Sequence, residues 1–231
     1  MSTQRIQPSY ATASGGTLSE ANLVRGGHDT DLHGSDVMEA RPFAIPSKKL
    51  VMWLFIISDA VTFGAMLFAY GYLKNASPNW PAPFKFYPSI FNVLLMTFVL
   101  VSSSLTMLIA VRHAKVGDKA KAIRWTYVTA ALGILFAVLH LREWSSLAAE
   151  GVHMFSNPWG TPMFGATFYS ITGLHLTHVL GGVIALTTVG TRYGTGRYTA
   201  DDLELGALYW HFVDLVWMFV VPMVYLMNIA R

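Results

Sequence analysis

Two stretches of this sequence contain no aspartate, glutamate, lysine or arginine over lengths that are unusual for a water-exposed helix. They are the 26 residues between Lys85 and Arg112 and the 41 residues between Glu150 and Arg192. Charged residues make up 13% of the whole chain, whereas about a quarter of the residues of soluble domains are charged. A helix that crosses the roughly 30 Å hydrocarbon core of a bilayer needs about 20 mostly apolar residues. The sequence therefore predicts a membrane protein.

Five segments are apolar over the length that a membrane span requires, and short connections containing Gly and Pro separate them. We expect an all-α integral membrane protein, built as a bundle of five transmembrane helices. The expected helices cover about residues 50–73, 89–111, 123–147, 163–190 and 205–230. Together they form one five-helix membrane domain over residues 48–231.

The residues that precede this domain have a different character. Residues 1–47 are polar and carry five acidic and three basic side chains, so we expect a flexible N-terminal segment without a core. Its first 20 residues lack the apolar run of a secretory signal, and we therefore expect the first membrane helix to target the chain. His28 and His33 lie beside aspartates in this segment, and we expect them to be solvated rather than metal-bound.

Lysine and arginine are unevenly distributed between the two sides that five spans define. Ten lie at the end of the N-terminal segment and start of the first span and in the second and fourth connections with their flanking helix ends, and four lie on the opposite side. Short connections that are rich in positive charge remain in the cytoplasm. We therefore expect a cytoplasmic N-terminus and an outer C-terminus.

The absence of cysteine excludes several classes of redox protein. Without Cys the chain cannot form disulfides, thiolate zinc or iron–sulfur sites, a c-type haem attachment or a copper centre with bridging thiolates. The formal net charge of +3 comes from basic residues that lie mostly at helix ends, so we expect no nucleic-acid partner.

Several ionisable side chains nevertheless fall inside the expected spans, where each costs at least about 2.5–3.5 kcal/mol without a partner. Asp59 lies within the first span, and three further spans each carry a pair spaced by three residues: His140 and Glu143, His175 and His178, His211 and Asp214. A spacing of three places both members of a pair on the same face of a helix.

Three interpretations of these groups remain open. Imidazoles and carboxylates are ligands of iron, zinc and manganese, but the expected depths of the pairs differ and no Glu-x-x-His repeat occurs, so we expect no metal. A buried hydrogen-bond network that joins the helices needs no complete ligand set and is the preferred interpretation. The third is proton handling, because a buried carboxyl group can exchange protons if water reaches it, and Asp59 is the best placed to do so.

Small residues indicate where helices approach one another. Gly173, Thr177, Gly181 and Ala185 recur at intervals of four, which is typical of a helix-packing stripe. The run from Ser102 to Ser104 can satisfy its hydroxyl groups on the preceding helical turn and also suggests a close contact.

Four ordered strings resemble a known family. LYWHFVDLVWMFVVPMVYL at residues 208–226 closely resembles the last helix of subunit III of the haem–copper terminal oxidases, which comprise the cytochrome c and quinol oxidases. TGLHLTHVLGG at 172–182, LGILFAVLHLREW at 132–144 and LFIISDAVTF at 54–63 are similar to earlier helices of the same subunit, in the same order. The resemblance covers about residues 48–230.

The resemblance includes departures from the family's pattern. The full form of subunit III has seven helices with lipids held between the first two and the rest, and this chain matches only the last five. Asp59 stands where many members have Glu, and Leu176 stands where a Gly usually follows the first His. A bound phospholipid is therefore an open expectation.

The resemblance implies an accessory function. Subunit III binds no haem or metal and has no catalytic residues; it packs on subunit I and supports proton uptake, assembly and stability during turnover. Oxygen reduction and proton pumping belong to the whole complex, whose other subunits carry haem and copper. The residues that correspond to the family's buried polar set are Asp59, Glu143, His175, His178, His211 and Asp214.

The implied partners are subunit I in direct contact, subunit II, a small subunit IV, membrane lipids and a respiratory supercomplex, and the implied location is a bacterial plasma membrane. Two alternatives remain: the five-helix protein that accompanies nitric-oxide reductases, and a free-standing membrane metalloprotein that uses the His and carboxylate pairs. The electron donor of the complex, cytochrome c or quinol, is not indicated by the sequence.

Overall fold

The computed structural model describes residues 47–229 and contains five long α-helices. The helices are α1 (Ser47–Ala76), α2 (Phe91–Lys115), α3 (Lys119–Ala149), α4 (Pro162–Gly194) and α5 (Ala200–Val220). All five helical segments are long and apolar enough to cross a membrane, which confirms the predicted all-helical architecture. The expectations for residues 1–46, including His28 and His33, lie outside the described residues.

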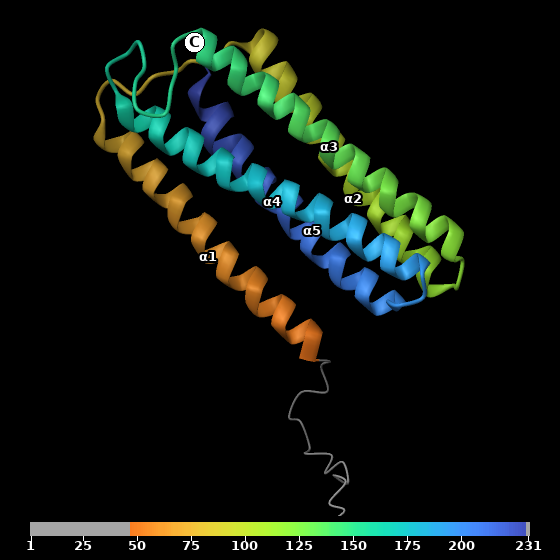
Figure 1. Ribbon diagram of the computed structural model, residues 1–231. Helices are drawn as coiled ribbons and strands as arrows, with labels where there is room; N and C mark the ends of the chain where they lie inside the picture. The colour runs from red at the N-terminus through yellow and green to blue at the C-terminus, as the bar shows by residue number, and fades with distance from the viewer. Residues whose placement is uncertain (1–46, 230–231) are drawn as a thin grey trace, which may run out of the picture. The chain divides into compact units, whose positions relative to one another are not determined.

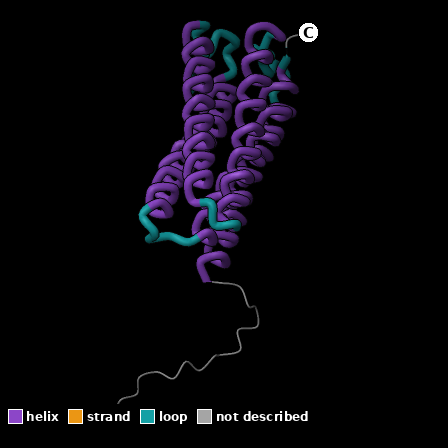
Figure 2. Tube along the Cα trace, turned by 90° about the vertical axis from the view of Figure 1, so that its right-hand side faces the viewer, coloured by secondary structure: helices purple, strands orange, loops and turns teal. Residues whose placement is uncertain are grey.

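The helices run side by side along one axis, with the connections gathered at the two ends (Figure 2). α3 packs between α2 and α4, and α5 packs against α4 and α2. α1 packs mainly on α4 and α5, on the side opposite to α2 and α3 (Figure 1). We call the end where α1 begins, which also holds the α2–α3 and α4–α5 turns, the Lys48 end, and the opposite end the Asn228 end.

The helix ends at the Lys48 end follow from local sequence. Asp118 caps α3 by accepting a hydrogen bond from the backbone of Lys121. α5 begins at Ala200, five residues before the expected start, because Thr199 and Asp202 form a reciprocal capping box. Gly117 follows α2 with a positive φ of 82°, a conformation that glycine adopts without strain.

The last span is less regular than expected. α5 is α-helical only to Val220, and a π-helical turn, Val221–Tyr225, and a 3₁₀ turn, Leu226–Asn228, complete it. The change coincides with Pro222, which has no N–H for the α-helical hydrogen bond and forces a different pattern. The final residues of the last span lie beside the connection before α2, where Phe84 donates its backbone N–H to the carbonyl of Asn228.

α1 is the least buried helix. In its most apolar window 17% of the residues are buried, against 39–50% in the other four spans. Its buried side chains, Ile56, Phe63, Leu67 and Tyr70, all lie beyond its first two turns. The part of α1 nearest the Lys48 end therefore has little apolar packing, which consists mainly of the partly buried Met52 and the contact between Phe55 and Tyr209.

Candidate functional site

Asp59 and His178 form a polar contact between α1 and α4. Asp59 Oδ2 lies 3.0 Å from His178 Nε2, and His178 Nδ1 lies 2.8 Å from the backbone carbonyl of Leu174. Both side chains are largely buried, with 18% and 17% of their surface exposed. Phe63 on α1 covers the imidazole edge-on, with 5.3 Å between ring centroids. The structure thus brings together two predicted residues that are far apart in sequence.

The hydrogen-bond geometry determines how many protons this pair holds. A carbonyl oxygen can only accept, so His178 Nδ1 carries a proton that it donates to Leu174. The contact between Nε2 and Asp59 Oδ2 then requires one further proton, located either on the carboxyl group or on the imidazole. Both forms are neutral as a pair, which suits a site inside a membrane.

The other two predicted carboxyl groups have partners that were not expected. Asn92 on α2 donates from Nδ2 to Glu143 Oε2 at 2.8 Å. Ser104 on α2 donates to Asp214 Oδ2 at 2.7 Å instead of bonding to the preceding turn, whereas Ser103 does bond to the preceding turn, through the carbonyl of Leu100. Asn92 is the one amide side chain within the uncharged run after Lys85, a signal that could have identified it. Each acid is therefore bonded to a neighbouring helix.

Trp210 connects α5 to α2, α3 and α4. Its indole Nε1 donates to Ser103 Oγ at 2.9 Å, and its ring lies against Gly133 and Gly182. A Cβ atom at Gly182 would be 2.9 Å from two ring carbons, and one at Gly133 would be 2.5 Å from another. At both positions an added Cβ would clash with the ring, so the close approach of α3 and α4 to Trp210 depends on glycine.

The predicted small-residue stripe lies beside this contact, on a more exposed face of α4. A Cβ at Gly173 would lie 3.4 Å from the Trp144 ring, and one at Gly181 would lie 3.8 Å from the Tyr209 hydroxyl group. Thr177 and Gly181 are exposed in this chain, and Gly173 and Ala185 are half-buried. The packing role of the stripe stays a prediction.

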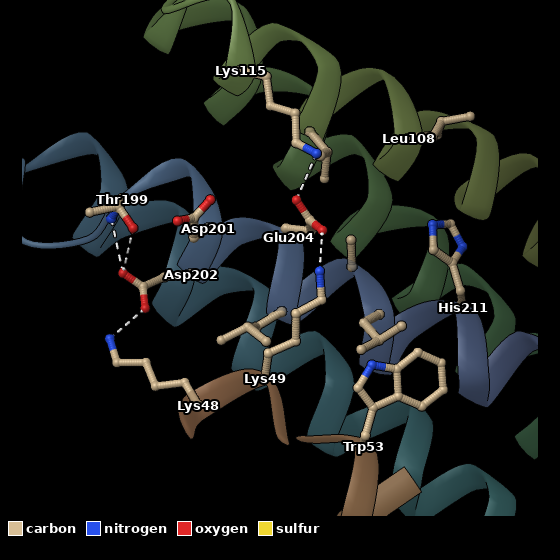
Figure 3. A pocket seen from close by; sticks show the side chains of 14 residues that line it. Lys48, Lys49, Trp53, Leu108, Lys115, Thr199, Asp201, Asp202, Glu204 and His211 are labelled. Atoms are coloured by element: carbon tan, nitrogen blue, oxygen red, sulfur yellow. Dashed lines mark hydrogen bonds and ion pairs between the residues drawn. The ribbon is translucent and has the colours of Figure 1, made fainter. Parts of the chain in front are cut away.

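A cleft of about 580 Å³ opens between α1, α2 and α5 at the Lys48 end (Figure 3). Ion pairs cross its mouth: Lys48 to Asp202 at 2.8 Å, Lys49 to Glu204 at 3.0 Å and Lys115 to Glu204 at 2.7 Å. The lining beyond them is mainly apolar, with Trp53 and Leu108 on opposite walls. The pairs of Lys48 and Lys49 attach the sparsely buried start of α1 to α5, and the pair of Lys115 attaches the end of α2 to α5.

His211 lines this cleft two turns further along α5 than Glu204. At 1.5 Å rise per residue the separation along the helix is about 10 Å. Asp214, one turn beyond His211, has its Oδ1 atom buried without a hydrogen-bond partner among residues 47–229. The cleft therefore leads from charged helix ends towards a buried carboxyl group.

His175 and His140 lie in a different environment, fully buried among aromatic rings. His175 stacks on Trp217 with 4.9 Å between ring centroids, and His140 stacks on Phe136 at 5.6 Å. Within the described residues, neither imidazole forms a salt bridge with the carboxyl group of Asp59, Glu143 or Asp214. Among residues 47–229 no three His, Asp or Glu side chains are grouped so that they could hold a metal ion.

The fold and this site define a class: five-helix membrane proteins in which paired polar groups join the helices inside an apolar bundle. A family profile described as cytochrome c oxidase subunit III matches residues 43–229. The chain belongs to this family.

Curated relatives agree with that assignment. The chain is 32% identical over 189 residues to cytochrome c oxidase subunit 3 of Bacillus sp. strain PS3, covering 80% of this chain and 87% of the relative. It is 30% identical over 184 residues to quinol oxidase subunit 3 of Bacillus subtilis strain 168, covering 78% and 87%. A probable cytochrome c oxidase subunit 3 of Mycobacterium bovis is 31% identical over 180 residues, covering 76% and 84%. The relatives include both cytochrome c and quinol oxidase subunits.

Proposed function

We propose that this chain is an accessory, non-redox subunit of a proton-pumping haem–copper terminal oxidase. The observation that carries the proposal is the family match over residues 43–229, together with relatives that are named as oxidase subunit 3. The interior is compatible with an accessory role, because the carboxyl groups of Asp59, Glu143 and Asp214 are each hydrogen-bonded to a polar side chain of a neighbouring helix. Oxygen reduction would then occur in partner subunits that carry haem and copper, with no catalytic residue in this chain.

The proposal includes a placement in the membrane and a set of partners. The ten basic residues near the ends of the spans on the N-terminal side, against four on the other side, support a cytoplasmic Lys48 end and an outer Asn228 end. The bacterial relatives support a location in a bacterial inner membrane. We expect direct contact with oxidase subunit I, and an assembly that also holds subunit II and a small subunit IV, within a respiratory supercomplex.

Support for proton uptake is the mechanistic part of the proposal. The Asp59 and His178 pair holds one shared proton at the interface between α1 and α4. The cleft at the Lys48 end offers water a route towards His211 and the free Oδ1 of Asp214. Glu143 and His175, the remaining members of the predicted polar set, lie away from that route; we expect a structural role for them.

The first experiment tests the assignment to a complex. A tagged copy of the chain is purified in mild detergent and a reduced-minus-oxidised optical spectrum is recorded on the material that accompanies it. An a-type or o-type haem signal together with larger subunits supports the oxidase proposal. A spectrum with only b- and c-type haem would instead place the chain beside a nitric-oxide reductase, and a colourless single chain would refute the accessory role.

The second experiment tests the proton role with a substitution that preserves shape. In Asp59→Asn the amide can still donate to His178 Nε2, but it has no dissociable proton. We expect normal assembly with slower proton uptake or earlier loss of activity during turnover. Thr62→Val on the same helix is the control, since Thr62 bonds only to the carbonyl of Ser58. Unchanged uptake and lifetime in Asp59→Asn would exclude this function of the pair.

A further inference from the structure

Two imidazole rings in the centre of the bundle are completely buried and make no hydrogen bond within residues 47–229. They belong to His140 on α3 and His175 on α4, each with 0% of its surface exposed. Both nitrogens of both rings are unpartnered. A neutral imidazole has one N–H donor and one acceptor nitrogen, so two donors and two acceptors are unsatisfied in this region.

Aromatic side chains form the walls around these rings. Phe136 lies between them, 5.6 Å from His140 and 5.7 Å from His175 by ring centroids. Trp217 contacts both, at 5.6 Å and 4.9 Å. Phe63 from α1 approaches His175 edge-on at 6.5 Å. We call these residues, with His140 and His175, the aromatic cluster.

Two further polar atoms beside the aromatic cluster are also buried without partners. They are Nε1 of Trp144, whose ring lies 5.2 Å from His140, and the hydroxyl group of Tyr225, whose ring lies 6.0 Å from Trp217. Trp217 donates to Thr97, and outside the cluster Trp210 donates to Ser103. Outside the cluster, Trp80 Nε1 and Asp214 Oδ1 are the other buried side-chain atoms without a partner among residues 47–229. Six of the eight buried side-chain atoms without a partner in residues 47–229 therefore lie in or beside the aromatic cluster.

Burial of an unpartnered polar group costs free energy, and in folded proteins most such groups are found to bond with protein or ordered water. A metal ion does not suit the cluster, because no third His, Asp or Glu joins the two imidazoles within the described chain. An anion does not suit it either, because Phe and Trp walls offer no charge to balance it. A water molecule both donates and accepts, and bound waters in proteins usually make two to four hydrogen bonds.

We propose that the aromatic cluster encloses bound water that hydrogen-bonds to His140 and His175 and so joins α3 to α4. The neighbouring Trp144 Nε1 and Tyr225 hydroxyl group are the additional atoms that such water can reach. The site is separate from the cleft at the Lys48 end, whose lining includes neither histidine. The proposal does not depend on which complex the chain joins.

Hydroxyl-radical footprinting by brief X-ray exposure tests the proposal, because radicals formed from bound water modify the side chains beside it. The sample is the full chain, purified with its native partners, and the products are quantified by mass spectrometry. Trp217 and Trp210 are a matched pair, since they are 0% and 1% exposed and both indoles donate a hydrogen bond. We expect modification of Trp217 and His140 several-fold faster than that of Trp210. Equal rates for Trp217 and Trp210 would overturn the proposal.

A substitution gives a second, independent test through the sign of a stability change. In a dry cluster, His175→Phe removes unsatisfied atoms and leaves the thermal midpoint of the complex unchanged or higher. In a hydrated cluster, the same change deprives the water of a partner. We then expect a lower midpoint together with a several-fold fall in the modification of Trp217. An unchanged or raised midpoint with unchanged modification of Trp217 would count against bound water.

Discussion

The contact between Gly133 and Trp210 predicts a strong effect from adding a single methyl group. In Gly133→Ala the new Cβ would lie 2.5 Å from one carbon of the Trp210 ring and 2.8 Å from a methyl group of Val183. Both distances are below ordinary van der Waals contact. The indole cannot retreat easily, because it is buried, its Nε1 is bonded to Ser103 and Gly182 lies against its ring.

Two opposing effects determine how much Gly133→Ala changes the free energy of unfolding. Overpacking of a well-packed core costs about 1–3 kcal/mol, whereas replacing Gly by Ala within a helix returns about 0.5–1 kcal/mol. The balance for Gly133→Ala is a loss of about 1–2 kcal/mol of unfolding free energy. For a chain of this size that loss lowers the thermal midpoint by about 2–8 °C.

The assay is thermal unfolding of the purified protein in detergent, followed by intrinsic tryptophan fluorescence. Gly64→Ala is the matched control, because Gly64 also lies within a helix but a Cβ added there would have no atom within 4 Å. We expect Gly64→Ala to leave the midpoint unchanged or slightly raised. Since residues in direct contact give non-additive effects, Trp210→Phe should partly relieve the penalty of Gly133→Ala. The packing argument is refuted if Gly133→Ala is as stable as Gly64→Ala.

Three further predictions concern polar contacts. Glu204→Gln should lower the thermal midpoint at low salt, with the difference disappearing near 1 M salt where exposed charges are screened, as a salt titration of both proteins would show. The hydrogen bonds and charge of Lys121 lower the pKa of Asp118 below its usual 3.8, which means that the ionised carboxylate stabilises the folded protein. This stabilisation is complete above about pH 4 and is lost as the pH falls through the lowered pKa. The advantage of wild type over Asp118→Asn in midpoint should therefore vanish in strongly acidic buffer, and an advantage that persists there would disprove the assignment. Asn92→Leu leaves the Glu143 carboxyl group without its hydrogen-bond partner and should lower the free energy of unfolding by about 1–3 kcal/mol. The double variant with Glu143→Leu should recover most of this loss. No recovery in unfolding measurements would contradict the pairing.

The helices could be predicted from the sequence because their signal is local. Runs without charge and short connections with Gly and Pro are enough to locate five spans. The ends were less predictable, since they depend on particular contacts. The capping box at Thr199 extends α5 at its start, and Pro222 ends its α-helical part before the apolar run finishes.

The polar residues of the site could also be recognised from the sequence, but their partners could not. Asp59 and His178 are separated by 119 positions, and no periodicity relates one to the other. The predicted pairs at a spacing of three have members that bond to other helices instead, as Asp214 does to Ser104. Spacing gives the face of a helix on which a side chain lies, whereas the choice of partner depends on how that helix is rotated against its neighbours.

The attachment of α1 shows why these polar contacts matter in a membrane. Lipid tails are as apolar as the helix surface, so burial of apolar side chains gives little net attraction between helices. α1, with its few buried residues, is held at intervals along its length by polar links. These are the Lys48 and Lys49 ion pairs, the contact between Asp59 and His178, and a hydrogen bond from Lys74 Nζ to the carbonyl of Met227 at 2.7 Å. The contact between Asp59 and His178 is the link among these that carries a shared proton within the bundle. Asp59, which we propose for proton handling, therefore also helps to hold α1 in place.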